Sequence, residues 1–195
     1  MTTQVEYFFD YVSPFSFLAN TQLAGIAGRT GAEFVYRPFL LGGVMQATGN
    51  SPPVTVAAKA RYMPTDIQRW CTRYGVALTP NPHFPVKTIH AMRGAIAAQE
   101  RGDLPVYHEA LFRAVWQEGK NVGDPQVLRD VVKAAGLDAD AILSRIGEQE
   151  IKDRLRANTE DAVERGAFGA PTFFLDGEMF FGNDRLDFLE EKLRG

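Results

Sequence analysis

The hydrophobic pattern of the first forty residues predicts a strand, a helix and a second strand. Val5–Phe9 is β-branched and aromatic, which is typical of a strand. From Ser13 to about Gly28, apolar side chains recur at helical spacing. Glu33–Pro38 then predicts another strand. Because the connection between the two strands is long enough to cross over, we expect them to be parallel.

The middle of the chain predicts helices only. Leu40–Pro53 is rich in glycine and ends in Thr48-Gly49-Asn50-Ser51-Pro52-Pro53, so we expect no regular structure there. A helix follows over 56–74, and Pro64 should kink or restart it. Further helices are expected over 88–101, 104–117 and 151–165. Between the last two of these, Asp124 and Asp138 are expected to cap two short helices.

The last thirty residues return to a strand pattern. Thr172–Leu175 and Met179–Phe181 flank Asp176-Gly177, a pair favoured in tight hairpin turns, and 186–193 is an amphipathic helix. The order is therefore βαβ, a run of helices, and αββα. It predicts an α/β fold with a thioredoxin-like arrangement, in which residues 1–45 and 160–195 form one discontinuous domain. Residues 46–159 form an inserted all-helical domain.

Composition narrows the classes of function. Among the 195 residues, 45% are hydrophobic and 23% charged, and the net charge of −3 gives no basic field for nucleic acid. No targeting sequence or membrane span is evident, so we expect a cytoplasmic protein. Cys71 is the single cysteine, which excludes an internal disulfide, and we expect it to pack in a helix. His83, His90 and His108 lack a ligand-like spacing, so we assign no metal site.

The segment Asp10-Tyr11-Val12-Ser13-Pro14-Phe15-Ser16 lies where the first strand gives way to the first helix. Ser13 is a favourable N-cap and Pro14 suits the first helical position. A helix N-terminus attracts an anion or a thiolate. In thioredoxin-like proteins a Cys-x-x-Cys pair begins this helix. Ser13 and Ser16 stand there instead, so the chain cannot itself exchange dithiols and disulfides; the alternative interpretation is that Ser13 only caps the helix.

Two later motifs indicate where a peptide could bind. Gly169-Ala170-Pro171-Thr172 opens a strand, and we expect the bond before Pro171 to be cis. In thioredoxin-like glutathione-binding proteins the backbone at this position pairs with the cysteinyl part of the peptide, as Ala170 would here. Asn183 and Asp184 lie at the entry to the last helix, where they could cap it, or receive the carboxylate and ammonium groups of a γ-glutamyl end.

Together with Thr48–Pro53 and Lys59-Ala60-Arg61-Tyr62-Met63, these motifs resemble the 2-hydroxychromene-2-carboxylate isomerase family, which is close to the kappa-class glutathione transferases. The resemblance covers nearly the whole chain in order. It implies a homodimer that uses glutathione to interconvert aromatic carboxylates in naphthalene-type catabolism. Ser13 would then be the catalytic serine that favours the glutathione thiolate. The implied glutathione contacts are Asn50, Ala170, Pro171, Asn183 and Asp184.

The chain departs from the family pattern near the expected acceptor substrate. Lys87 stands where we expect Asn, and Asn121-Val122-Gly123 replaces an acidic-aliphatic pair. Side chains that could wall an aromatic pocket or meet its carboxylate, each with a core or surface role as the alternative, are Phe15, Phe39, Lys59, Arg61, Lys87 and Trp116. Substrate identity therefore stays open at the level of sequence.

Two other classes of function remain open. A kappa-like transferase would conjugate glutathione to an electrophile and consume it, whereas an isomerase would return the thiol. A noncatalytic thioredoxin-like module would bind glutathione weakly or not at all.

Overall fold

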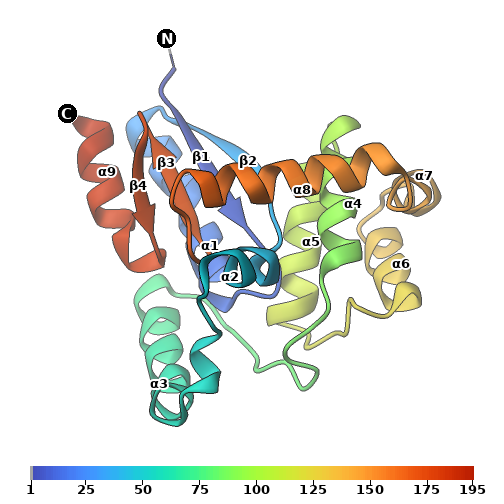
Figure 1. Cartoon of the computed structure of the whole chain (residues 1–195), viewed down its shortest axis with the longest axis horizontal. Coiled ribbons are helices and arrows are strands. Elements are labelled where there is room, and N and C mark those ends of the chain that lie inside the picture. Colours follow the sequence, from blue (N-terminus) through green and yellow to red (C-terminus); the bar gives the residue numbers. More distant parts are fainter. Residues whose placement is uncertain (1) are drawn as a thin grey trace.

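The computed structural model describes residues 2–195 (Figure 1). The elements follow in the order β1 (Gln4–Phe9), α1 (Pro14–Thr30), β2 (Glu33–Pro38), α2 (Leu41–Thr48), α3 (Ala57–Tyr74), α4 (Ile89–Glu100), α5 (Leu104–Trp116), α6 (Pro125–Ala134), α7 (Ala139–Arg145), α8 (Gln149–Glu164), β3 (Thr172–Leu175), β4 (Glu178–Phe181) and α9 (Leu186–Arg194). Short 3₁₀ helices lie at Pro53–Thr55 and Asn183–Arg185. The predicted order of elements is confirmed, apart from α2.

The sheet has four strands in the order β2-β1-β3-β4. β1 and β2 are parallel, in a register that pairs Val5 with Phe34, as the crossover connection predicted. β3 runs antiparallel to β1 and to β4. Asp176 and Gly177 join the hairpin with φ of 50° and 81°, the left-handed conformation that this turn requires.

Both faces of the sheet are covered, which explains why β1 ends in three consecutive buried aromatic residues, Tyr7, Phe8 and Phe9. Val5, Tyr7 and Phe9 point to a core that extends through α1, α4, α5 and α6. Phe8 points to the opposite face, where α2 and α8 pack. In Figure 1 α8 crosses in front of the strands, whereas α9 lies beside β4 at the edge.

The expectation of an irregular segment after Leu40 is wrong, because residues 41–48 form α2. Its first N–H groups are held from outside the helix. Leu40 N–H donates to Thr159 Oγ1 at 3.0 Å and Leu41 N–H donates to Asp10 Oδ2 at 3.0 Å. A Cβ at Gly43 would lie 3.3 Å from Thr159 Cγ2, so glycine allows α2 to approach α8 closely. Tertiary contacts here override a low helix propensity.

The expectation that Pro64 restarts the helix is also wrong, since α3 is one helix from Ala57 to Tyr74. A proline inside a helix removes one backbone hydrogen bond. The surrounding turn of α3 is exposed, so water can bond the freed carbonyl. Cys71 is the one buried residue of α3, and the helix projects from the body of the molecule in Figure 1.

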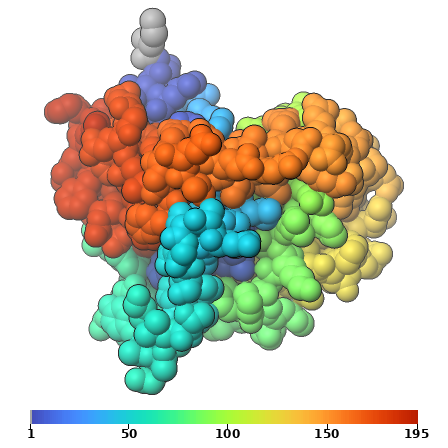
Figure 2. Space-filling model, viewed as in Figure 1, coloured from blue at the N-terminus to red at the C-terminus, as the bar shows by residue number. Residues whose placement is uncertain are grey.

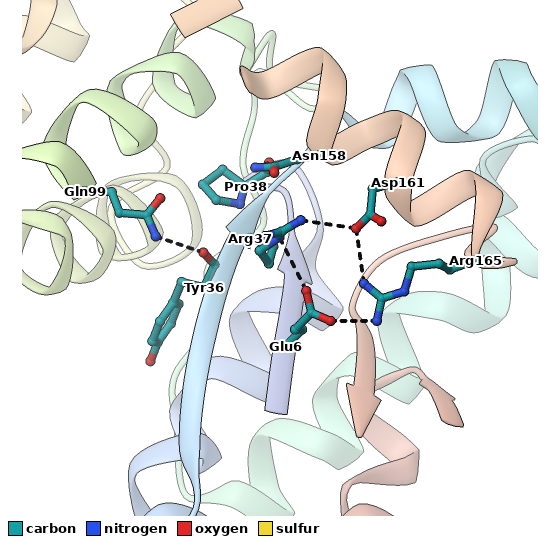
Figure 3. Close-up of polar contacts among 8 residues, drawn as sticks. All are labelled: Glu6, Tyr36, Arg37, Pro38, Gln99, Asn158, Asp161 and Arg165. Carbon is teal, nitrogen blue, oxygen red and sulfur yellow. Dashed lines mark hydrogen bonds and ion pairs between the residues drawn. The ribbon is translucent and has the colours of Figure 1, made fainter. Parts of the chain in front are cut away.

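A ring of four charged side chains ties the sheet to α8 (Figure 3). Arg165 donates to Glu6 on β1 at 2.6 Å and to Asp161 on α8 at 3.1 Å. Arg37 on β2 pairs with Asp161 at 3.2 Å and with Glu6 at 3.6 Å. The Arg165 guanidinium also lies 3.8 Å from the centre of the Phe174 ring. These contacts hold α8 against the strands.

In the described residues, no helix is long and apolar enough to cross a bilayer.

Candidate active site

Ser13 lies between the end of β1 and the start of α1, almost fully buried. Its extended backbone makes it the N-cap, and its Oγ accepts a hydrogen bond from the Ser16 N–H at 3.1 Å. The same hydroxyl donates to the carbonyl of Ala170 at 3.1 Å, although 157 residues separate the two. Ser13 is therefore a cap, as the sequence indicated, and it also contacts the segment before Pro171. The capping and catalytic interpretations are compatible.

The backbone around Pro171 is shaped by neighbouring loops. The Ala170–Pro171 bond is cis, as expected, and a second cis bond at Phe84–Pro85 was not anticipated. Gly182 N–H donates to Pro171 carbonyl at 3.0 Å, and Thr172 Oγ1 donates to Gly169 carbonyl at 2.8 Å. Ala170 is buried beside Ser13, and its carbonyl faces the N-terminus of α1 through the Ser13 hydroxyl.

Asn50 is joined to the same region. It follows α2, and its Nδ2 donates to the carbonyl of Phe168 at 2.8 Å while its Oδ1 accepts from Ser51 N–H at 2.8 Å. The Phe168 ring in turn lies 4.4 Å from the ring of Phe181, centre to centre. The structure thus brings Asn50 next to the segment that leads to Pro171, a proximity for which the sequence provided no independent argument.

Asn183 and Asp184 form the start of the 3₁₀ helix before α9, which packs against α1. Neither side chain caps a helix, so the capping alternative is not observed. Asn183 is buried, its carbonyl accepts from the Tyr74 hydroxyl at 2.9 Å, and its side-chain Nδ2 has no partner among residues 2–195. Asp184 is exposed and pairs with Arg185 at 2.7 Å. An unpaired buried amide nitrogen is a donor available to a ligand.

Asp10 is a site residue whose role sequence reasoning did not identify. Its buried carboxylate accepts hydrogen bonds from the Val12 N–H at 3.1 Å, the Thr88 hydroxyl at 2.6 Å and the Leu41 N–H at 3.0 Å. Burial raises the pKa of Asp10, and the three hydrogen bonds oppose that rise. Its backbone carbonyl also accepts the Ser13 N–H at 3.0 Å. A charged residue directly after an apolar strand was the available signal.

The proposed substrate side chains occupy three kinds of environment. Phe39 is fully buried with Phe8 and Val44, and Trp116 is buried with its Nε1 donating to the Tyr11 carbonyl at 2.8 Å. Phe15 is half-buried against the main core. The cationic candidates are exposed; they are Lys59, Arg61 and Lys87. Phe39 and Trp116 therefore have structural roles here, whereas the other four keep accessible surface.

Two buried titratable side chains, His108 and Cys71, have pKa values shifted by burial. His108 lies between the Tyr11 hydroxyl at 3.3 Å and Asn20 Oδ1 at 2.9 Å, and burial lowers its pKa to about 3. Burial raises the pKa of the Cys71 thiol. Across residues 2–195, no group of three or more His, Cys, Asp or Glu side chains could hold a metal ion.

Comparison with known proteins agrees with this geometry. The DSBA-like thioredoxin domain family matches residues 4–194. A 2-hydroxychromene-2-carboxylate isomerase of Sphingobium xenophagum is 35% identical over 99% of both chains. Human glutathione S-transferase kappa 1 is 28% identical over 97% of this chain and 90% of its own.

Among solved structures, one of a 2-hydroxychromene-2-carboxylate isomerase superposes with a TM-score of 0.88 at 31% identity, covering 97% of this chain and 94% of its own. Fold and sequence both agree over essentially the full length. The chain therefore belongs to the 2-hydroxychromene-2-carboxylate isomerase family, within the DsbA-like thioredoxin domains.

Proposed function

We propose that this protein is a glutathione-dependent isomerase that acts on 2-hydroxychromene-2-carboxylate or a related aromatic catabolite. The observation that carries the proposal is the 3.1 Å contact between the Ser13 hydroxyl, at the N-terminus of α1, and the Ala170 carbonyl. A peptide thiol paired with Ala170 would lie beside this hydroxyl. The names of the isomerase and kappa-class relatives support the reaction and the cofactor, respectively.

The residues present fit glutathione. Asn183 Nδ2 is a buried donor without a partner, suited to a carboxylate, and Asp184 is an exposed carboxylate suited to an ammonium group. The Ala170 carbonyl has a second lone pair besides the one that Ser13 uses, so it can accept a peptide N–H. Asn50 and Pro171 would complete the contacts on the side of the Phe168 loop.

The chain's own groups would prepare and orient the thiol. The helix N-terminus favours a negative sulfur, and the Ser13 hydroxyl does so when its one hydrogen turns from the Ala170 carbonyl to the sulfur. Both effects lower a thiol pKa from about 8.5 toward neutrality. When bound, glutathione would supply a thiolate that adds reversibly to a conjugated double bond, so that the bond can rotate before elimination. Lys59, Arg61 or Lys87 would meet the substrate carboxylate at the exposed side, and Phe15 would contact its ring.

The inserted helical domain has a role in this proposal. Residues 1–45 and 160–195 would supply the glutathione contacts other than Asn50, whereas 46–159 would supply Asn50 and the cationic side chains that meet the acceptor substrate. The same proposal includes a homodimer in the cytoplasm, by likeness to the family. Light scattering in solution tests the dimer, and a monomer at micromolar concentration would contradict it.

The decisive experiment measures conversion of the chromene carboxylate with and without glutathione, with free thiol counted at the end. We expect turnover only with glutathione and no loss of thiol. Turnover that consumes thiol would instead favour a conjugating transferase, the function that the kappa-class relatives suggest. No turnover, together with no heat of glutathione binding by calorimetry, would favour a noncatalytic module.

A further inference from the structure

A groove of about 680 Å³ runs along α8, away from Ser13. Its walls come from α2, α8 and one side chain of α4. Figure 2 shows α2 and α8 side by side on the visible face, with α4 beyond the end of α2. None of the proposed glutathione contacts lines it. Its volume falls in the range of sites that bind small molecules.

The floor of the groove is small and apolar. Leu155, Thr159 and Val163 recur every four residues along α8, and Gly43 and Ala47 face them from α2. The Thr159 hydroxyl is already engaged, since it donates to the Leu155 carbonyl at 2.8 Å and accepts from Leu40 N–H. The floor therefore offers little hydrogen bonding, and an apolar body would fill it best.

Among the described residues that line this groove, Arg93 is the one with a buried polar atom that lacks a partner. Its Nε is buried and bonds to no residue of 2–195. Glu100, on the same helix, is engaged by Arg145 and Arg154. Glu160 and Glu164 line the groove and form no ion pair with Arg93 in the described part of the chain. A buried donor of a guanidinium that lacks an acceptor is costly, so an anion at this point would be stabilising.

Charge is also separated along α8. Lys152 lines the groove in the first turn of α8, and Arg156, which pairs with Asp153, lines it at the middle of the helix. Glu160 and Glu164 line it near the end. Cations near a helix N-terminus oppose the helix dipole, so this order does not serve to stabilise the helix itself. Because Asp153 already pairs with Arg156, the groove cations without an ion pair among residues 2–195 are Lys152 and Arg93.

We propose that this groove is a second ligand site, which binds a small aromatic carboxylate with its ring on the apolar floor and its carboxylate on Arg93. A carboxylate matches the fork formed by two nitrogens of a guanidinium. Arg93 as a whole is half-buried, so its side chain keeps accessible surface. The site is separate from the one that contains Ser13, and the proposal does not depend on the reaction catalysed there.

The test uses 2-naphthoate as the probe and titration calorimetry on the full chain saturated with glutathione. Arg93→Met keeps the apolar stem but removes the guanidinium, and should weaken binding at least tenfold. Arg154→Met is the matched control, because Arg154 pairs with Glu100 and lies outside the groove, and should leave binding unchanged. The neutral analogue 2-naphthylmethanol should bind wild type and Arg93→Met equally weakly.

A second variant protects the test against misfolding of Arg93→Met. Ala47 is exposed on α2 and lines the groove, so Ala47→Phe should fill the apolar floor and also weaken naphthoate binding at least tenfold. Naphthoate binding that is absent at millimolar concentration, or that neither Arg93→Met nor Ala47→Phe weakens, would overturn the proposal. If only substitutions of Ser13 weaken naphthoate binding, the probe binds at the site that contains Ser13, and the groove proposal is overturned as well.

Discussion

The Ser13 hydroxyl makes two hydrogen bonds: it caps the N-terminus of α1 and it donates to Ala170. Ser16 occupies the position of the second thiol in a dithiol site, and its buried Oγ has no partner among residues 2–195. A hydroxyl cannot form a disulfide, so the reactive sulfur must come from a bound molecule. The protein's own contribution is then to the charge state and orientation of that sulfur.

Replacing Ser13 by alanine should separate binding from chemistry. We expect Ser13→Ala to lower turnover by about 10²-fold, because one hydrogen bond to a developing or stable anion is lost, while glutathione affinity changes little. Ser144→Ala, on the exposed surface of α7, is the matched control and should be neutral. Steady-state kinetics and calorimetry measure the two quantities, and unchanged turnover would remove Ser13 from the mechanism.

His108 should make stability depend on pH. Burial lowers its pKa to about 3 from an ordinary value of 6.5, so the unfolded chain binds a proton that the folded chain rejects. The free energy of unfolding is therefore unaffected by His108 above pH 6.5. It falls by about 1.4 kcal/mol per pH unit as the pH drops from 6.5 toward 3, because protonation of His108 favours the unfolded chain. Denaturant unfolding at pH 8 and pH 5 measures this slope.

The control for this effect is His108→Phe, which should flatten the difference between pH 8 and pH 5. The variant should also be less stable at pH 8 by about 1–3 kcal/mol, because the buried Tyr11 hydroxyl loses its partner. An equal slope in both proteins would assign the pH dependence to other groups.

At the scale of elements, Asp10 joins β1, α2 and the start of α4. One carboxylate oxygen accepts hydrogen bonds from the Val12 N–H and the Thr88 hydroxyl, and the other accepts one from the Leu41 N–H at the start of α2. In Asp10→Asn, one carboxylate oxygen is replaced by an NH₂ group. That donor would then face one of the three groups that donate to Asp10 in the wild type. We expect a loss of about 2–3 kcal/mol in the free energy of unfolding.

Hydrogen exchange should show where that loss falls. In Asp10→Asn the amides of α2 should lose protection before those of the strands, because the start of α2 is held by this carboxylate. Asp176→Asn is the control, since the exposed turn at φ 50° tolerates asparagine. Unaltered exchange in α2 would show that Asp10 does not hold it.

At the scale of the whole molecule, the charged ring in Figure 3 links β1 and β2 to α8. Arg165 also stacks on Phe174, so its removal costs an ion pair and a cation–π contact together. We expect Arg165→Met to destabilise the protein by about 1–2 kcal/mol. The matched control is Arg129→Met, whose exposed pair with Asp140 should contribute far less. Equal effects in thermal unfolding would contradict a special role for the ring.

The predicted division into a discontinuous domain and an inserted helical domain stays a prediction. The main core includes residues of both segments, with Leu18 and Phe173 from one and Leu111 and Val132 from the other. Separate unfolding transitions for the two parts in native-state hydrogen exchange would support the division.

Local chemistry in the sequence was sufficient for most elements and for the identity of the site segments. Periodicity marks β1, α1 and β2, the Asp-Gly pair marks the hairpin, and Asp124 and Asp138 cap helices as expected. The motifs around Ser13, Pro171 and Asn183 could be recognised because each depends on residues adjacent in the chain. The cis bond before Pro171 is one such local feature.

Contacts distant in sequence decided the rest. α2 forms because Asp10 and Thr159 satisfy its first N–H groups and Gly43 allows close packing on α8, none of which is visible in residues 41–48. Trp116 and Phe39 are aromatic residues of the kind that line substrate pockets, yet both side chains are buried by packing. The Arg93 groove exists only where three helices meet. Sequence alone thus determined most elements and their order, because these depend on neighbouring residues, and tertiary structure decided which side chains are buried and which stay accessible, because that depends on contacts between distant segments.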